Sequence, residues 1–325
     1  GWTAVDFIFP VFLFLVGVSV ALAVPRDAVQ TGPLSIWPQA LKRAATLFGF
    51  GLLVNGFPSF HLDTLRIPGV LQRIAVVYLA VLWLHLHLGK YGLSVVIAVI
   101  LLGYWLLWSF VPVPGLGFPT LDYEYNLESW LDQMFMRGHL WEYDTSWDPE
   151  GILSTLPCIA LALLGTLAGR WLRMENGPGF GSMLALGVLL HLGGLAWDKW
   201  FPINKIITTS SFVLFVGGAG LAALAVLHRL LDDDRPRPWL RPVLALGKNA
   251  LFLYVLSELL TQILFFTKLP GLSGGRESLH FWLFDACFGF IGDKFVASFA
   301  WGITWALLLC GLAMIMDSRN IKIRL

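Results

Sequence analysis

Charged residues are scarce in this sequence. Asp, Glu, Lys and Arg together make up 13% of its 325 residues, whereas an average soluble domain has roughly 25%. Hydrophobic residues account for 57% of the chain, and its mean hydropathy is +0.73. Such a composition excludes a water-soluble fold and indicates a membrane protein.

Cysteine is also rare, and the chain lacks the patterns of two common classes of binding protein. Cys158, Cys287 and Cys310 lie in apolar sequence, and three cysteines without metal-ligand spacing argue against a disulfide framework or a zinc site. No cluster of Lys and Arg alternates with aromatic residues, as a nucleic-acid-binding surface would require. We therefore expect no metal and no nucleic-acid partner.

Long apolar stretches are abundant instead. A hydrocarbon core about 30 Å thick needs roughly 20 residues of helix, and nine stretches meet this length. The sequence therefore predicts an all-α polytopic membrane protein with about nine transmembrane helices. The predicted spans are Asp6 to Val24, Ala40 to Phe57, Gly69 to Leu88, Gly92 to Val111, Ile152 to Leu172, Phe180 to Trp197, Ile206 to Leu230, Val243 to Thr267 and Lys294 to Met316.

Two segments between the spans have structure of their own. The stretch Leu279 to Gly292 is apolar but short and contains Asp285, so it is predicted to be interfacial or re-entrant. The longest segment, 112–151, contains an amphipathic helix that we expect to lie on the membrane surface. Its apolar positions are Leu127, Trp130, Leu131, Met134 and Phe135. Because no internal repeat is evident, we predict a single domain over residues 1–325.

The distribution of positive charge predicts the orientation. One alternating set of turns holds thirteen Lys and Arg residues and the other holds eight, and cytoplasmic turns are the ones enriched in Lys and Arg. Segment 112–151 falls in the poorer set and should face the periplasm or lumen, with the C-terminus in the cytoplasm. This segment has a single Arg137 against Asp122, Glu124, Glu128, Asp132, Glu142, Asp144, Asp148 and Glu150.

Polar residues occur where the bilayer makes them costly. Glu258 lies in the middle of the span Val243 to Thr267, where an ionisable residue needs a partner or a function. Other polar residues gather at the predicted outer helix ends and describe a cavity open to the outside, suited to a hydroxyl-rich or amino ligand. They are Asp6, Arg66, Gln72, Arg73, Asp148, Glu150, Ser154, Asn204 and Ser210. The alternative is that they are helix caps and interface anchors, and that Glu258 pairs inside the bundle.

Five blocks of sequence, spread from end to end, resemble one known family. They are Gly1-Trp2-Thr3-Ala4-Val5-Asp6-Phe7-Ile8-Phe9-Pro10, Arg66-Ile67-Pro68-Gly69-Val70-Leu71-Gln72-Arg73, Asp148-Pro149-Glu150-Gly151-Ile152-Leu153-Ser154-Thr155, Asn204-Lys205 with Ser210-Ser211-Phe212, and Gly247-Lys248-Asn249-Ala250-Leu251. In this order they resemble the heparan-α-glucosaminide N-acetyltransferase family and its bacterial relatives.

The resemblance implies a transmembrane acyltransferase. Such a protein takes acetyl-CoA from the cytoplasm and delivers the acetyl group to the amine of a glucosamine on the far side. The family's catalytic histidine stands a few residues before the segment that matches Gly1-Trp2-Thr3, so we expect that histidine, and a further helix, ahead of Gly1.

Roles for individual residues follow from that reaction. Acyl transfer needs a base for the amine proton and donors for the carbonyl oxygen. The candidate catalytic residues are Asp6, which would orient the histidine, and Glu258. The outer polar residues named above, from Arg66 to Ser210, would bind the sugar. Coenzyme A is anionic and prefers basic groups at inner helix ends; the candidates are Arg43, Arg170, Lys248 and Asn249.

A proton-coupled amino-sugar permease is the alternative function, because a polar outer cavity and a buried Glu258 would also suit a transporter. Transporters are often built from internal repeats, and none is evident here, so the enzyme is favoured. The short length favours a bacterial inner membrane over a lysosome. The acceptor sugar, the choice between a histidine intermediate and direct transfer, and the oligomeric state, including a homodimer, stay open.

Overall fold

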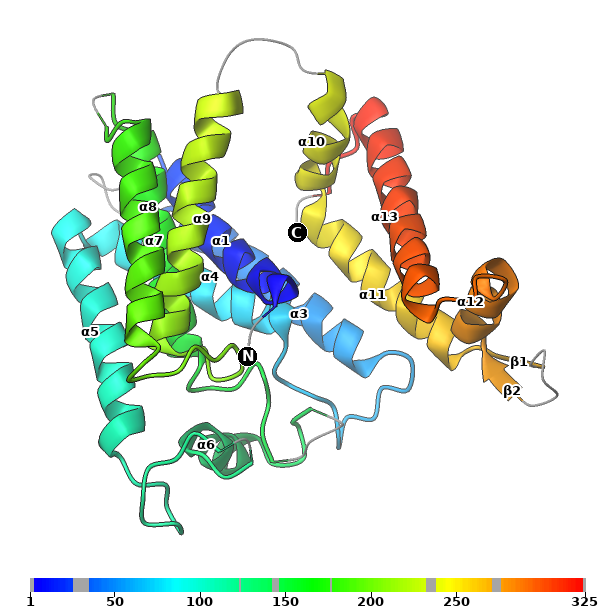
Figure 1. The fold of residues 1–325 in the computed structure, drawn as a ribbon, viewed down its shortest axis with the longest axis horizontal. Coiled ribbons are helices and arrows are strands. Elements are labelled where there is room, and N and C mark those ends of the chain that lie inside the picture. Colours follow the sequence, from blue (N-terminus) through cyan, green and yellow to red (C-terminus); the bar gives the residue numbers. More distant parts are fainter. Residues whose placement is uncertain are drawn as a thin grey trace. The chain divides into compact units, whose positions relative to one another are not determined.

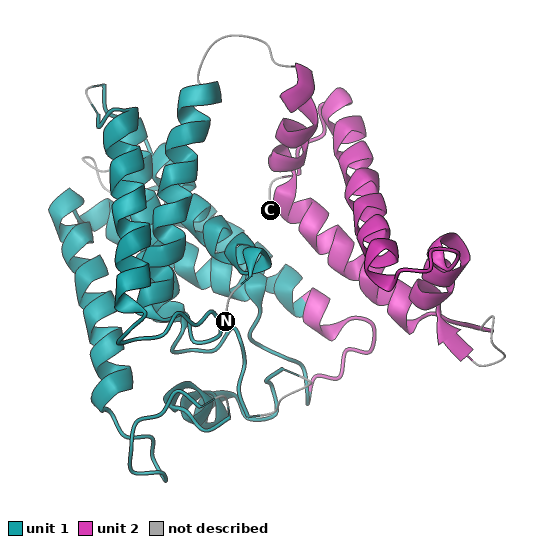
Figure 2. Cartoon of the chain, viewed as in Figure 1, with its two compact units in different colours: residues 1–52, 63–233 teal, residues 53–62, 234–325 magenta. Residues whose placement is uncertain are grey.

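The computed structural model describes residues 3–25, 35–122, 124–141, 146–175, 177–231, 238–270 and 276–323. Gly1, Trp2, Glu142 and Asp144 lie outside the described residues. The chain divides into two compact units (Figure 2). Unit 1 comprises residues 1–52 and 63–233, and unit 2 comprises residues 53–62 and 234–325. That the whole chain acts as one domain stays a prediction.

Helices make up nearly all of the regular structure, because a helix satisfies its own backbone hydrogen bonds where no water is present. In unit 1 these are η1 (Ala4–Phe7), α1 (Ile8–Ala23), most of α3 (Trp37–Gly56), α4 (Val70–His87), α5 (Lys90–Phe110), α6 (Leu127–Met136), α7 (Thr155–Leu172), α8 (Phe180–Trp197) and α9 (Ser210–Leu231). In unit 2 they are η3 (Pro238–Leu240), α10 (Arg241–Lys248), α11 (Ala250–Phe266), α12 (Leu279–Phe288) and α13 (Lys294–Ser318).

The predicted fold class is confirmed: the protein is helical and multi-pass. Among the described residues, seven helices are long and apolar enough to cross a membrane, or eight if the bent pair α10 and α11 forms one span. The seven are Ala4–Ala23, Val70–His87, Lys90–Phe110, Thr155–Leu172, Phe180–Trp197, Ser210–Leu231 and Lys294–Ser318.

The difference from the nine predicted spans has two sources. The second predicted span forms α3, which has the required length but is not among the candidates; Gln39, Lys42 and Arg43 lower the hydropathy of its first turns. The predicted span Val243 to Thr267 is bent by 71° between α10 and α11. Asn249 stands at the bend, and its side chain bonds the backbone of Ile321 and Ile323 instead of continuing one straight helix.

Unit 1 is held together by close helix contacts. The helices α8 and α9 run side by side (Figure 1), and α1 packs against α7. A Cβ atom at Gly17 of α1 would collide with the carbonyl oxygen of Ala162, and one at Gly165 of α7 would collide with that of Phe14. Glycine is therefore required where these two backbones meet.

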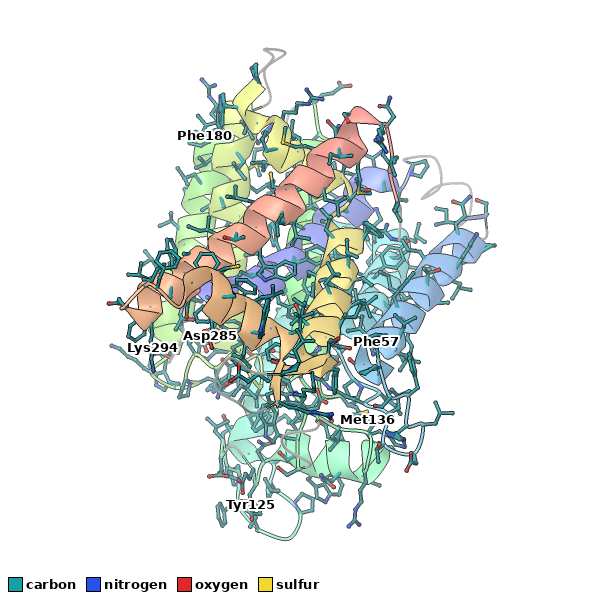
Figure 3. The ribbon with its side chains drawn as sticks, turned by 90° about the vertical axis from the view of Figure 1, so that its right-hand side faces the viewer. Phe57, Tyr125, Met136, Phe180, Asp285 and Lys294 are labelled. Carbon is teal, nitrogen blue, oxygen red and sulfur yellow. The ribbon has the colours of Figure 1, made fainter. Side chains whose placement is uncertain are left out.

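The predicted amphipathic helix in segment 112–151 forms α6. It lies beyond the ends of the long helices of unit 1, as Figure 1 and the labels Tyr125 and Met136 in Figure 3 show. Its exposed side includes Trp130, Met134 and Phe135. Glu128 and Asp132 are buried, so the polar face of this helix points into the protein.

Unit 2 contains the small amount of sheet that the structure describes. Strands β1 (Lys268–Pro270) and β2 (Arg276–Ser278) pair antiparallel, with Lys268 opposite Ser278. They lead into α12, which occupies the stretch that was predicted to be interfacial or re-entrant. Ser278 caps this helix, because its hydroxyl accepts a hydrogen bond from the N–H of Phe281.

Candidate functional site

The segment from Asp148 to Ser154 precedes α7 and is held by Arg66, which lies between α3 and α4. Arg66 donates from Nε to Asp148 Oδ2 at 2.8 Å and from Nη2 to Asp148 Oδ1 at 2.6 Å. Its Nη2 also donates to Glu150 Oε2 at 2.6 Å. Burial alone would lower the pKa of Arg66, but the two carboxylates raise it above its ordinary value. This three-residue cluster fixes where Glu150 lies.

The buried face of α6 holds the same segment from the other side. Asp132 Oδ1 accepts from the N–H of Ile152 at 2.9 Å, and Glu128 Oε1 accepts from the N–H of Ser154 at 3.0 Å. These N–H groups lie just before α7, of which Ser154 is the N-cap residue. Burial, and then the neighbouring Asp132, raise the pKa of Glu128 to about 8; burial raises the pKa of Asp132 to about 6.

Arg73, in the first turn of α4, contacts this segment from inside the bundle. Its Nη2 donates to Gly151 O at 3.0 Å and to Ser154 Oγ at 2.5 Å. Its Nη1 lies 3.7 Å from Cys158 Sγ. The side chain is buried, with 4% of the residue exposed.

Asp6, in η1, pairs with a lysine from a distant part of unit 1. Lys205 Nζ donates to Asp6 Oδ1 at 3.0 Å. Asp6 Oδ2 accepts from the backbone N–H of Thr3 at 2.8 Å and from its hydroxyl at 3.0 Å. The carboxylate is thereby oriented at the entrance of α1.

Several of these groups border one cavity of about 570 Å³ within unit 1. Its polar lining comes from Asp6, Arg73, Glu150, Asn204, Lys205 and Thr208. Its apolar lining includes Phe9, Pro10, Leu13, Trp141, Trp147, Pro149, Cys158, Leu161, Ile203, Ile206 and Phe212. A concave, mostly apolar pocket with a few convergent polar groups is the usual form of a small-molecule site.

Residues 1–195 match the family model described as heparan-alpha-glucosaminide N-acetyltransferase, catalytic. The chain belongs to this family. It is also similar to two curated proteins named heparan-alpha-glucosaminide N-acetyltransferase: 26% identical over 322 residues to one from Mus musculus and 26% over 319 residues to one from Homo sapiens. These matches cover 80% and 78% of the chain, and 48% and 47% of the relatives. The chain thus spans about half the length of these relatives.

The structure brings several residues of the family-like blocks together. Asp6, Arg73, Glu150 and Asn204 come from four different blocks and line the same cavity. Asp148 is fully buried beneath it, on Arg66. That this cavity faces the outside and binds a sugar stays a prediction.

Other predicted residues make structural contacts. Ser210 Oγ donates to Leu101 O at 2.6 Å and so ties α9 to α5, while Asn204 Oδ1 accepts from the N–H of Ile206 at 2.9 Å. Gln72 is buried with its side chain against Gly51. For these residues the contacts match the alternative of caps and anchors, although Asn204 also reaches the cavity.

The two proposed coenzyme A residues of unit 1, Arg170 and Arg43, differ in the contacts that they already make. Arg170 donates to His85 Nδ1 at 3.1 Å, to His85 O at 2.7 Å and to Leu88 O at 2.8 Å. It thus satisfies carbonyl groups at the end of α4. Arg43 lies over the ring of Tyr78, with 5.2 Å from its Cζ to the ring centroid. Its guanidinium N–H groups can still donate to a further partner.

Three predicted residues belong to unit 2 and are described there alone. Glu258 is partly buried in α11. Lys248 Nζ pairs with Asp317 Oδ1 at 2.5 Å. Asn249 Nδ2 donates to Ile321 O at 3.2 Å, and its Oδ1 accepts from the N–H of Ile323 at 2.8 Å. Lys248 and Asn249 thus organise the end of this unit.

The sequence analysis missed the roles of Glu128, Asp132 and Lys205. A usable signal for the first two was present: they are four residues apart, and therefore lie on one face of the amphipathic helix. Among the described residues, no group of three or more His, Cys, Asp or Glu side chains is placed to hold a metal ion. The described groups that line the cavity are carboxylate, guanidinium, ammonium, amide, hydroxyl, thiol, aliphatic and aromatic.

Proposed function

We propose that this protein transfers an acetyl group from acetyl-CoA to the amine of a glucosamine-type sugar. One observation carries the proposal: in a chain of this acetyltransferase family, four residues from separate family-like blocks line one cavity. The cavity volume of about 570 Å³ is in the range of small-molecule sites.

The lining suits an amino sugar. The carboxylates of Asp6 and Glu150 attract an ammonium group and accept hydrogen bonds from sugar hydroxyls. Trp141 and Trp147, whose ring centroids are 5.8 Å apart, offer apolar faces to the C–H side of a sugar ring. Asn204 and Lys205 add further polar groups to the lining.

Within this proposal Asp6 orients and charges the histidine that the family carries ahead of this segment. Asp148 acts through Arg66, since it is buried and bonded to that residue, whereas Glu150 reaches the cavity. We assign Glu150 to the sugar amine. Glu258 stays a weaker candidate, because it lies in unit 2.

We further propose that the cavity opens to the periplasm or lumen and that acetyl-CoA is bound from the cytoplasm. The excess of Lys and Arg in the alternate turns supports this orientation. Arg43 and Arg170 of unit 1 would face the nucleotide, with Arg43 the stronger candidate since, among the described residues, it binds no backbone carbonyl as Arg170 does. Lys248 and Asn249 stay candidates from the sequence in unit 2. A bacterial inner membrane and a cytoplasmic C-terminus complete the proposal.

Membranes containing the complete protein test this function. They are incubated with radiolabelled acetyl-CoA and glucosamine, with N-acetylglucosamine as the control acceptor because its amine is blocked. We expect labelled N-acetylglucosamine from glucosamine alone, and a reduced yield from Glu150→Gln but not from the exposed Glu124→Gln. Passage of glucosamine across the membrane without acetylated product would overturn the transferase and favour the permease.

A further inference from the structure

Arg73 presents a buried positive charge to the cavity. It lines the cavity wall and is 4% exposed. The groups that hold its guanidinium are a backbone carbonyl (Gly151), a hydroxyl (Ser154) and a thiol (Cys158). All three are uncharged in their ordinary states, so they fix the guanidinium in place without neutralising it.

The carboxylates near Arg73 are engaged elsewhere. Asp148 and Glu150 both pair with Arg66, and their two negative charges exceed its one, so they also attract Arg73 from beyond ion-pair distance. Glu128 accepts from the N–H of Ser154, and burial raises its pKa to about 8, so it is largely neutral at pH 7. None of the ion pairs among the described residues includes Arg73.

One donor of Arg73 is left over for a ligand. Within the described part of the chain, its Nε is buried and has no hydrogen-bond partner. A buried donor without a partner is unfavourable unless the site uses it. An anion, or an oxygen that becomes one during reaction, would accept a hydrogen bond from this guanidinium.

We propose that Arg73 binds the carbonyl oxygen of the acetyl thioester and stabilises the negative charge that develops on it during transfer. This inference rests on the proposed acetyltransferase function. It assigns to Arg73 a role in the transition state, and leaves recognition of the amine to the carboxylates.

The chemistry of the transfer fits a fixed cation. A nitrogen nucleophile forms a bond to the carbonyl carbon, and the π electrons of the C=O bond move to the oxygen. They return as the C–S bond breaks; coenzyme A leaves as a thiolate and takes up the proton that the nitrogen loses. The oxygen is fully charged only between these events, so Arg73 stabilises the transition state more than the bound thioester. The nitrogen can belong to the sugar or to a histidine.

Substitution of Arg73 by Met separates this role from a structural one. Met has a similar length, so it keeps the packing and removes the cost of burying a charge. Ser154 Oγ and Thr155 Oγ1 also donate to Gly151 O, so that carbonyl keeps partners without Arg73. We expect Arg73→Met to unfold at the wild-type temperature or above it, while kcat falls about 10²–10³-fold, as for loss of an oxyanion donor.

The experiment uses the complete protein in detergent, with Arg137→Met as the control, because Arg137 is an exposed residue beyond α6. Turnover is measured with acetyl-CoA and glucosamine, and affinity with S-ethyl-CoA, which lacks the carbonyl oxygen. We expect Arg73→Met to lower kcat, to change KM for glucosamine less than threefold, and to bind S-ethyl-CoA as wild type does. Retention of kcat within threefold would overturn the proposal, as would an effect confined to KM, which would indicate a ligand carboxylate instead.

Two further outcomes are decisive. If Arg73→Met does not fold, Arg73→Lys replaces it: a tenfold lower kcat with unchanged S-ethyl-CoA affinity supports the proposal, and equal loss of both, or of neither, overturns it. If the wild-type protein acetylates no amine at all, the proposed function fails, and this result is distinct from the failure of an Arg73 variant in an active protein.

Discussion

The carboxylate of Glu128 accepts a hydrogen bond from the backbone N–H of Ser154, at 3.0 Å, and so links two helices that are separate in the sequence. Ser154 in turn bonds Arg73, which lines the cavity. Glu128 does not line the cavity itself. It is therefore a positioning residue, and its protonation state should affect how firmly the start of α7 is held.

The first prediction concerns the pH dependence of stability. Burial raises the pKa of Glu128 from 4.5 to about 8, so the folded protein keeps a proton that the unfolded chain loses above pH 4.5. Stability should therefore fall as the pH rises from about 4.5 to about 8, by at most about 1.4 kcal/mol per pH unit for one proton. Asp132 adds to this fall up to about pH 6.

Glu128→Gln tests this prediction, because Gln keeps the acceptor oxygen and has no proton to lose. The thermal midpoint in detergent is measured from pH 5 to pH 8. Wild type should lose stability over this range, the Gln variant should lose less, and Glu124→Gln, an exposed change in the same segment, should follow wild type. Parallel curves for wild type and Glu128→Gln would contradict the assignment.

The second prediction concerns Gly151, against which both α6 carboxylates are packed. A Cβ atom at this position would collide with Asp132 Oδ2 and would lie 2.6 Å from Glu128 Oε1. Gly151→Ala should therefore destabilise the protein by about 1–3 kcal/mol, as overpacking usually does, and should lower activity by displacing Glu150.

The control for Gly151→Ala is Gly193→Ala, since a Cβ at Gly193 of α8 has no other atom within 4 Å. That change should leave the thermal midpoint unchanged or raise it, because Ala favours the helix. Equal unfolding temperatures for the two variants would contradict close packing of the α6 carboxylates against Gly151.

Much of the fold could be predicted from the sequence, because membrane helices are encoded by local hydropathy. The spans around Val70, Lys90 and Ser210 were found in this way. The bend at Asn249 could not be predicted, since it depends on hydrogen bonds to Ile321 and Ile323, more than 70 residues along the chain.

The candidate site was predictable only in part. Motif blocks identified Asp6 and Glu150 as outer polar residues, and both line the cavity. The buried carboxylates of α6 were not predicted, because the prediction for this helix rested on its apolar residues, which were expected to lie on the membrane surface. Glu128 and Asp132 bond backbone groups of Ser154 and Ile152, and backbone partners leave no pattern in the side chains.

The last prediction concerns Asp6, whose carboxylate is shared between Lys205 and Thr3. Asp6→Asn keeps an oxygen for the hydrogen bonds from Thr3 but removes the negative charge. Lys205 is partly exposed, and such a pair contributes about 0–1 kcal/mol, so expression and thermal midpoint should hardly change. If Asp6 orients the base, turnover should fall about tenfold or more, in line with the size of general-base effects.

Asp63→Asn is the matched control for Asp6→Asn, because Asp63 is an exposed aspartate of unit 1 that does not line the cavity. Turnover of labelled acetyl-CoA with glucosamine is compared at equal amounts of protein in the membrane. Wild-type turnover in Asp6→Asn would remove Asp6 from the reaction and leave it as part of the capping box of η1. A loss of turnover in both variants would instead indicate that the summed negative potential of unit 1, and no single carboxylate, attracts the amine.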